Sequence, residues 1–239
     1  MLWFRDEIIT FTIHKTMGID KFLVIFIFLA LSFSFVTAVD PAPLDDFCVA
    51  LAPSGSKLAV TENGQLCKDP KLVTADDFFY SGLNIPSNTN NRIRSNLTDV
   101  TVKEIKGLNS LGISIGRIDF APNGITPPTY HPRVSEIRIV LAGTIYVGFI
   151  TSNPDHRVFA KILRPGDVFV VPVGLIHFVR NIGKTPAVLI VAYNGQNPDA
   201  VLVPNTIFGS TPPISPEVLV KSFQLDKKTV VNLQKQDWT

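Results

Sequence analysis

Short runs rich in valine, isoleucine and phenylalanine alternate with prolines and glycines along most of this chain, which holds 18 prolines and 15 glycines in 239 residues. This pattern divides the chain into many short segments separated by turns, and it is typical of all-β sandwiches and barrels. The run AVLIVAY at residues 187–193 is apolar at nearly every position and predicts a buried strand. We therefore expect an all-β fold.

Charge and length exclude several other classes of protein. The formal net charge is only +2, so there is no basic excess of the kind that nucleic-acid binding requires, and we expect no nucleic-acid partner. No repeat of fixed period is found in the sequence. The length fits one ordinary globular domain together with a removable segment.

The N-terminal segment predicts secretion. Residues 22–36 form an almost unbroken apolar run, which is short for a membrane span, and Val36 and Ala38 suit the −3 and −1 positions of a signal-peptidase site. We expect a signal peptide at residues 1–38 and a mature chain at residues 39–239, with no membrane association after cleavage. A signal anchor is the alternative, and translation from Met17 would give a more usual signal peptide.

Two features fit an extracellular chain. Cys48 and Cys67 are the only cysteines, and a secreted chain with two cysteines most simply closes one disulfide; two thiol ligands for a metal are the less favoured alternative. Asn96 lies in the only glycosylation sequon, Asn96-Leu97-Thr98, and we expect it to carry a glycan.

Two stretches hold candidate metal ligands. In residues 127–143, strand alternation places Glu136 on the same face as Arg138 and Val140, and His131 precedes it by five positions. In residues 166–181, His177 is the only strong metal donor. Two histidines and one carboxylate can hold a divalent transition metal and leave coordination positions open. The alternative is that each is a hydrogen-bonded structural residue, which is the commoner role of a histidine or glutamate on a strand.

The same two stretches resemble the paired motifs of the cupins, and more narrowly those of plant germins and germin-like proteins. In the first motif His131 is the second histidine of His-x-His, Glu136 is the glutamate and Gly143 the final glycine. The second motif is matched without a gap by Gly166, Pro172, His177 and Asn181. The resemblance implies a single-domain cupin β-barrel (jelly roll) with its core at about residues 100–205, and short C-terminal α-helices at about residues 215–236. It also implies that His131, Glu136 and His177 bind Mn(II).

Four positions depart from the germin pattern. Thr129 stands where germins have the first histidine of His-x-His, and Asn123 replaces the opening glycine. Two asparagines that approach oxalate in germins fall on Gly116 and Thr126. We expect the turn at Asn123 to survive, because asparagine tolerates left-handed backbone and Gly124 follows. The fourth metal ligand and both amide donors are lost.

The resemblance therefore implies a secreted glycoprotein of the plant cell wall and apoplast, with a structural or defence-related role. It implies a homo-oligomer, a hexamer in germins, and Mn(II) that is weakly bound or absent. We expect no oxalate oxidase activity, and the sequence assigns no catalytic residue. An enzyme that tolerates Thr129, either a Mn-dependent superoxide dismutase or an oxalate oxidase, is the main alternative. A cupin that binds a sugar or hormone in an apolar barrel pocket is another.

Overall fold

The structure is a computed structural model that describes residues 46–51 and 66–238. The signal peptide expected at residues 1–38 lies outside the described residues. Within the described part of the chain, no helix combines the length and the apolar character needed to cross a membrane.

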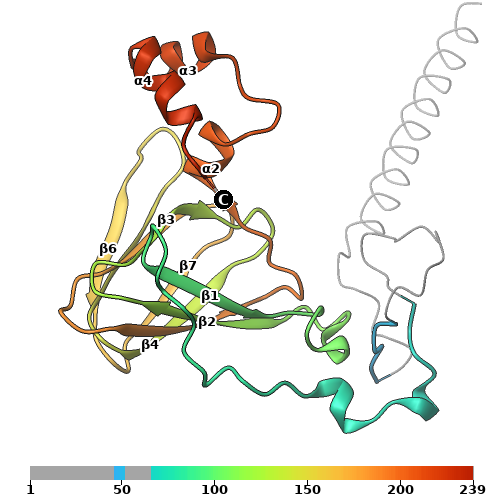
Figure 1. The fold of residues 1–239 in the computed structure, drawn as a ribbon. Coiled ribbons are helices and arrows are strands. Elements are labelled where there is room, and N and C mark those ends of the chain that lie inside the picture. Colours follow the sequence, from blue (N-terminus) through green and yellow to red (C-terminus); the bar gives the residue numbers. More distant parts are fainter. Residues whose placement is uncertain (1–45, 52–65, 239) are drawn as a thin grey trace, which may run out of the picture. The chain divides into compact units, whose positions relative to one another are not determined.

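In residues 46–51 and 66–238, ten strands form two five-stranded antiparallel sheets, which confirms the all-β prediction (Figure 1). The first sheet has the order β1-β2-β9-β4-β7 and the second the order β10-β3-β8-β5-β6. The strands are β1 (Ser95–Val100), β2 (Ser114–Phe120), β3 (Ile125–Tyr130), β4 (Glu136–Ala142), β5 (Ile145–Ile150), β6 (Val158–Leu163), β7 (Val168–Val171), β8 (Ile176–Asn181), β9 (Ala187–Tyr193) and β10 (Val201–Leu202). Short 3-10 turns cover Pro70–Leu72, Ala75–Phe78 and Lys106–Leu108.

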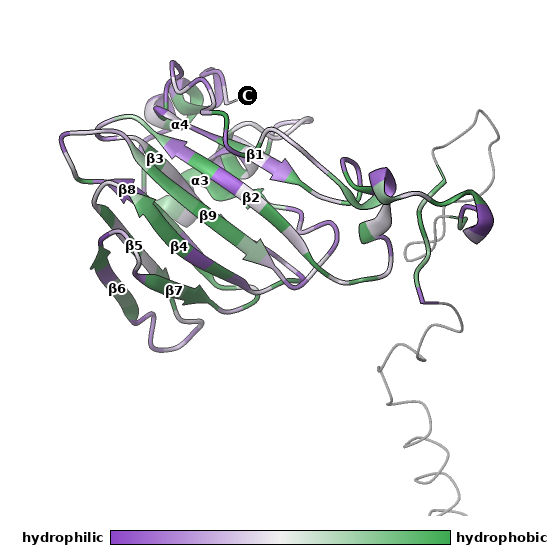
Figure 2. Ribbon diagram, turned by 90° about the horizontal axis from the view of Figure 1, so that it is seen from below, coloured by the Kyte–Doolittle hydropathy of each residue, from purple (hydrophilic) through white to green (hydrophobic). Residues whose placement is uncertain are grey.

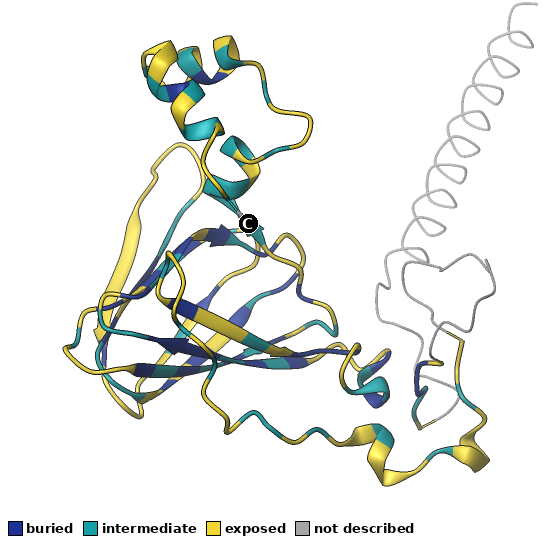
Figure 3. Ribbon diagram, in the orientation of Figure 1, coloured by how far each residue is buried: buried dark blue, intermediate teal, exposed yellow. Residues whose placement is uncertain are grey.

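The core lies between the inner faces of the two sheets (Figure 3). Strand β9 is central to the first sheet, between β2 and β4, and every second residue of its run AVLIVAY is buried. This matches the strand predicted at residues 187–193. The buried cluster draws on both sheets and includes Val140, Ile145, Val147, Leu163, Val179, Leu189 and Val191.

Strand β4 has its apolar face outside and its polar face inside. Ile137, Ile139 and Leu141 are exposed, whereas Glu136 and Arg138 are buried together with Val140. Figure 2 shows hydrophobic residues along β4 and the neighbouring β7. The barrel interior at this end therefore holds charged side chains, and an apolar surface faces outward on β4.

The turns that frame the motif strands require particular backbone conformations. Gly143 has φ +85°, and a Cβ there would come within 2.3 Å of the Ala187 Cβ. At the turn before β3, Asn123 adopts left-handed backbone with φ 63°. Gly124 follows it, and a Cβ there would lie 2.2 Å from the Arg94 carbonyl oxygen. The turn survives the change to Asn123, as the sequence predicted.

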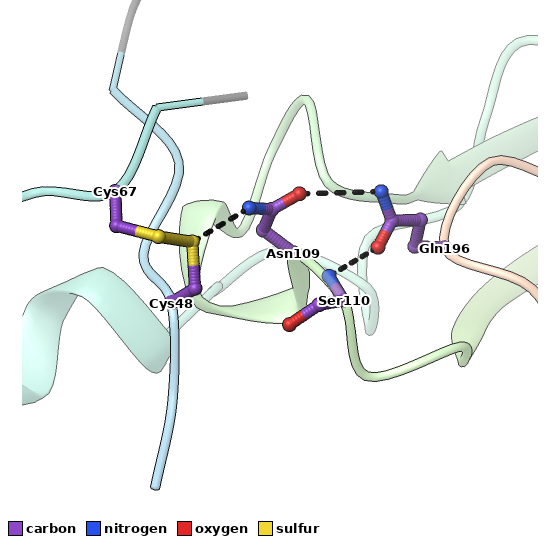
Figure 4. The surroundings of a disulfide bond; sticks show 5 residues. All are labelled: Cys48, Cys67, Asn109, Ser110 and Gln196. Atoms are coloured by element: carbon purple, nitrogen blue, oxygen red, sulfur yellow. Dashed lines mark hydrogen bonds between the residues drawn. A yellow bond between two sulfur atoms is a disulfide. The ribbon is translucent and has the colours of Figure 1, made fainter. Parts of the chain in front are cut away.

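Cys48 and Cys67 form a disulfide (Figure 4). Asn109 Nδ2 donates to Cys48 Sγ at 3.1 Å, and Gln196 Nε2 donates to Asn109 Oδ1 at 3.3 Å. These contacts tie the disulfide to the loop after Lys106–Leu108 and to the segment that follows β9. In the chain-entropy account, a loop of this size is stabilised by about 3 kcal/mol.

The C-terminal segment is helical: α2 (Val203–Phe208), α3 (Pro216–Phe223) and α4 (Lys227–Gln234). Helix α3 begins after Ser215, and α4 begins after Asp226, whose carboxylate accepts from the Thr229 amide. Leu219 and Val230 are the buried residues of these two helices. Helix α2 was not predicted from the sequence, and it packs beside β3 and β10.

Candidate metal centre

Three side chains from different strands meet inside the barrel. His131 directly follows β3, Glu136 is the first residue of β4, and His177 is the second residue of β8. One ligand atom from each lies within 4.8 Å of the other two. Glu136 Oε1 is 3.2 Å from His177 Nε2, and Glu136 Oε2 is 3.7 Å from His131 Nε2. The structure thus brings together the three candidate ligands that the two motifs indicated.

Backbone carbonyls orient both imidazole rings. His131 Nδ1 donates to the Asp199 carbonyl oxygen, and His177 Nδ1 donates to the Leu175 carbonyl oxygen at 3.1 Å. Because Nδ1 then carries the proton, the Nε2 atom of each neutral ring has a free lone pair. The two rings are stacked, with centroids 5.4 Å apart. Both lone pairs are therefore turned toward Glu136.

Burial sets the protonation of His177, which is 1% exposed. Loss of solvent around the ring, followed by the positive charge of Arg138, lowers the pKa of His177 to about 4, against a smaller opposing effect of Glu136. Its imidazole is therefore neutral at physiological pH, as a metal ligand must be. Burial also raises the pKa of Tyr193, whose ring stands edge-on to His131 at 5.1 Å.

Arg138 is the functional residue that the sequence reasoning missed. Its Nη2 lies 2.5 Å from Glu136 Oε1, and the two side chains are 2% and 1% exposed. Strand alternation had placed Arg138 on the face of Glu136, and that was the available signal. A buried arginine beside a buried glutamate forms an ion pair that strongly affects what else the carboxylate can bind.

Thr129 offers no ligand to the centre. It is 4% exposed, and it faces His177 in the register of β3 and β8. Its hydroxyl donates to the Pro127 carbonyl oxygen at 2.8 Å. Position 129, where germins have the missing histidine, is thus beside the other ligands. The side chain there is the hydroxyl of Thr129, and it is already hydrogen-bonded to the backbone.

The remaining motif residues have structural roles or lie apart. Asn181 is fully buried; its Nδ2 donates to the carbonyls of Ala121 and Thr185, and its Oδ1 accepts from the Gly183 amide, so it ties the turn before β3 to the turn between β8 and β9. Asn96, in the sequon, is exposed on β1.

A cavity of about 370 Å³ opens onto the centre. Thr129, His131, Arg138 and His177 contribute to its wall, and exposed residues such as Arg92 and Asn96 lie along its outer part. Much of the remaining wall is apolar: Ile93, Leu97, Ile118, Pro127, Leu202 and Trp238. Its volume lies in the range of small-molecule sites. Thr126 also lines it, whereas Gly116 lies on β2 beside Asp99 and Val191.

The donor set fits a divalent metal ion in kind and in position. Glu136 Oε2 and His177 Nε2 are buried and have no hydrogen-bond partner, whereas Glu136 Oε1 is paired with Arg138 Nη2. Buried acceptors without a donor are costly, and a cation held by Oε2 and Nε2 would remove that cost. The misfit is in charge, because the guanidinium of Arg138 already lies against the same carboxylate.

Comparison with known proteins agrees with this architecture. The cupin family model matches residues 81–231. Germin-like protein subfamily 1 member 20 from Arabidopsis thaliana is 54% identical over 91% of this chain and 97% of its own length. The chain is a germin-like protein of the cupin family. Both the barrel and the family that the motifs indicated are thereby confirmed.

Two solved structures are similar to this protein. An oxalate oxidase in complex with the substrate analogue glycolate is 42% identical, with a TM-score of 0.75 over 82% of this chain and 96% of that chain. Peruvianin-I, described as a cysteine peptidase from Thevetia peruviana latex, is 39% identical, with a TM-score of 0.62 over 69% of this chain and 98% of that chain.

Proposed function

We propose that this germin-like protein is a secreted plant cell-wall glycoprotein whose barrel binds Mn(II) weakly through His131, Glu136 and His177, without oxalate oxidase activity. The observation that carries the proposal is the convergence of two imidazole Nε2 atoms on one buried carboxylate. Three such ligands suit a divalent transition metal with open positions. A role in defence follows only from the resemblance to germins.

The protein's own residues would hold the metal without rearrangement of the two rings. The carbonyls of Asp199 and Leu175 accept from Nδ1 of the two rings and leave both Nε2 atoms free. Burial limits the contact of the imidazoles with water. A bound Mn(II) would supply redox chemistry and open coordination positions. Thr129, with its hydroxyl bonded to Pro127, leaves the donor set one imidazole short of the germin set.

Oxalate oxidation is disfavoured by the loss of two specific contacts. The germin positions that supply two amide donors to oxalate are Gly116 and Thr126 here, and neither side chain carries an amide. The structural relative with glycolate is an oxalate oxidase, so that activity, or a superoxide dismutase activity, remains the alternative. Cysteine chemistry is not proposed, because the chain's two cysteines are joined to each other.

Metal analysis of the purified secreted protein tests the proposal. We expect substoichiometric Mn as isolated, measurable weak binding on titration, and loss of that binding in His177→Ala. His156→Ala is the matched control, because His156 is exposed in the turn before β6 and should leave Mn binding unchanged. Near-stoichiometric Mn together with oxalate oxidase or dismutase turnover would support the enzymatic alternative and reject this one.

Secretion and glycosylation are supported by the disulfide and by the exposure of Asn96 on β1. We expect enzymatic removal of N-glycans to lower the mass of the secreted protein, and Asn96→Gln to show the lower mass without treatment. An unchanged mass in both comparisons would reject the glycan.

We further propose a homo-oligomer, hexameric as the germin resemblance implies. The support is the exposed apolar face of the first sheet, formed by Ile137, Ile139 and Leu141 on β4 with Val168 and Val170 on β7. Large exposed apolar patches mark interaction surfaces. We expect analytical ultracentrifugation to give a hexamer and Ile139→Lys to dissociate it into smaller species. A monomeric wild type would contradict the proposal.

A further inference from the structure

Arg138 depends on the carboxylate that the metal site also needs. Within the described residues, Glu136 is the one carboxylate at ion-pair distance from its guanidinium. The two other nitrogens, Nε and Nη1, are buried and lack hydrogen-bond partners. An arginine cannot lose its charge at any physiological pH, and a buried charge persists only where an opposite charge compensates it. Arg138 therefore depends on Glu136 for charge compensation.

A divalent metal bound by Glu136 and the guanidinium of Arg138 would be two positive charges beside the same carboxylate. A metal held by Glu136, His131 and His177 would lie next to the guanidinium, among side chains that are at most 7% exposed. Coulomb repulsion between cations a few ångströms apart is weakly screened there. Either the metal binds less tightly or the guanidinium must leave its position, and both outcomes reduce the apparent affinity.

We propose that Arg138 is a built-in competitor of the metal: it neutralises Glu136 when no metal is bound, keeps the barrel folded in that state, and lowers the affinity of the centre for divalent cations. This inference rests on the proposed function, because it concerns the same three ligands. It adds a second cause of weak binding to that of Thr129, since one residue removes a ligand and the other adds a charge.

Replacing Arg138 by methionine tests the inference through affinity and stability. Methionine keeps an unbranched apolar side chain and removes the charge. We expect the Mn(II) dissociation constant, measured by titration of the chelator-treated protein, to fall at least about tenfold. We also expect the melting temperature of Arg138→Met to be low in chelator and to rise with Mn(II), because the metal then replaces the missing partner of Glu136. The wild-type melting temperature should respond little to either.

Two further variants separate charge from general damage. Arg138→Lys keeps the charge and should retain the weak affinity of the wild type, whereas Arg138→Gln should behave as the methionine variant does and serves if the latter fails to fold. Arg117→Met is the matched control: Arg117 pairs with Asp119 at 2.8 Å, with side chains 11% and 8% exposed, away from the ligands. It should lose stability without gaining Mn(II) affinity.

The outcomes distinguish this inference from the proposed function. If the wild type binds Mn(II) through His177 and the folded Arg138→Met and Arg138→Gln variants bind it no more tightly, the role of Arg138 is overturned and the metal site stands. If neither the wild type nor these variants bind Mn(II), both are overturned. An equal gain in Arg117→Met would assign the effect to net charge and would also reject the inference.

Discussion

Glu136→Leu is expected to destabilise the metal-free barrel by about 3–5 kcal/mol, the usual cost of removing one partner from a buried ion pair. The reason is the charge that remains: Arg138 would be left buried beside neutral groups, with Nε and Nη1 already unpartnered. Neutral His177 cannot compensate it. Urea unfolding in the presence of a chelator measures the effect without a contribution from bound metal.

The double variant Glu136→Leu/Arg138→Met is the decisive control. It removes both charges, and an apolar replacement of a buried ion pair is commonly neutral or stabilising, so we expect most of the lost stability to return. Glu217→Leu is a matched comparison, because Glu217 pairs with Lys227 at 2.8 Å on the surface. Its removal should leave the unfolding midpoint unchanged. A small effect of Glu136→Leu, or no recovery in the double variant, would show that Arg138 does not depend on Glu136.

The sequence predicted the three candidate ligands through the resemblance of two stretches to the paired cupin motifs. His131, Glu136 and His177 stand at fixed distances from turn residues such as Gly143 and Gly166, and these turns set the strand register that brings the side chains together. Glycine is needed at Gly143, where backbone with positive φ lies against Ala187. Motif spacing therefore reports geometry even when one ligand, here Thr129, has changed.

Arg138 could not be assigned in the same way, because strand β4 inverts the usual burial pattern. Alternation separates Ile137 and Ile139 from Glu136 and Arg138, but an apolar face normally indicates the core. Here that face is exposed and the charged one is buried. Only the packing of the first sheet against the second decides which face of β4 lies inside, and only then does the ion pair become visible.

The cavity was also beyond sequence reasoning. Its wall combines β1, β3 and β8 with helix α2 and Trp238. The ring of Trp238 lies under the guanidinium of Arg92, at 4.9 Å from its centroid. Segments so far apart in sequence carry no local pattern that reports their contact. The alternative of a sugar- or hormone-binding cupin calls for an apolar barrel pocket, and the cavity has a largely apolar wall. Neither the wall nor the volume of the cavity could be derived from the sequence.

Thr129→His is expected to strengthen Mn(II) binding most in the absence of Arg138. Thr129 faces His177 across β3 and β8 and borders the cavity, so an imidazole there has both room and a position beside the other ligands. In the Arg138→Met background we expect a further gain in Mn(II) affinity of about 10–100-fold, which is the effect that residues hydrogen-bonded to a metal ligand commonly have on metal affinity. In the wild-type background Arg138 still competes, and we expect a gain below about tenfold.

Mn(II) titration of the wild type, both single variants and the double variant measures this coupling directly. Leu97→His is the matched control, because it adds an imidazole to the wall of the same cavity at an exposed position of β1; it should not raise the affinity. Equal gains from Thr129→His with and without Arg138 would mean that the two residues affect Mn(II) binding independently and would contradict the coupling. No gain in either background would mean that position 129 does not point at the centre, and that the weakness of the site has another origin than a missing ligand.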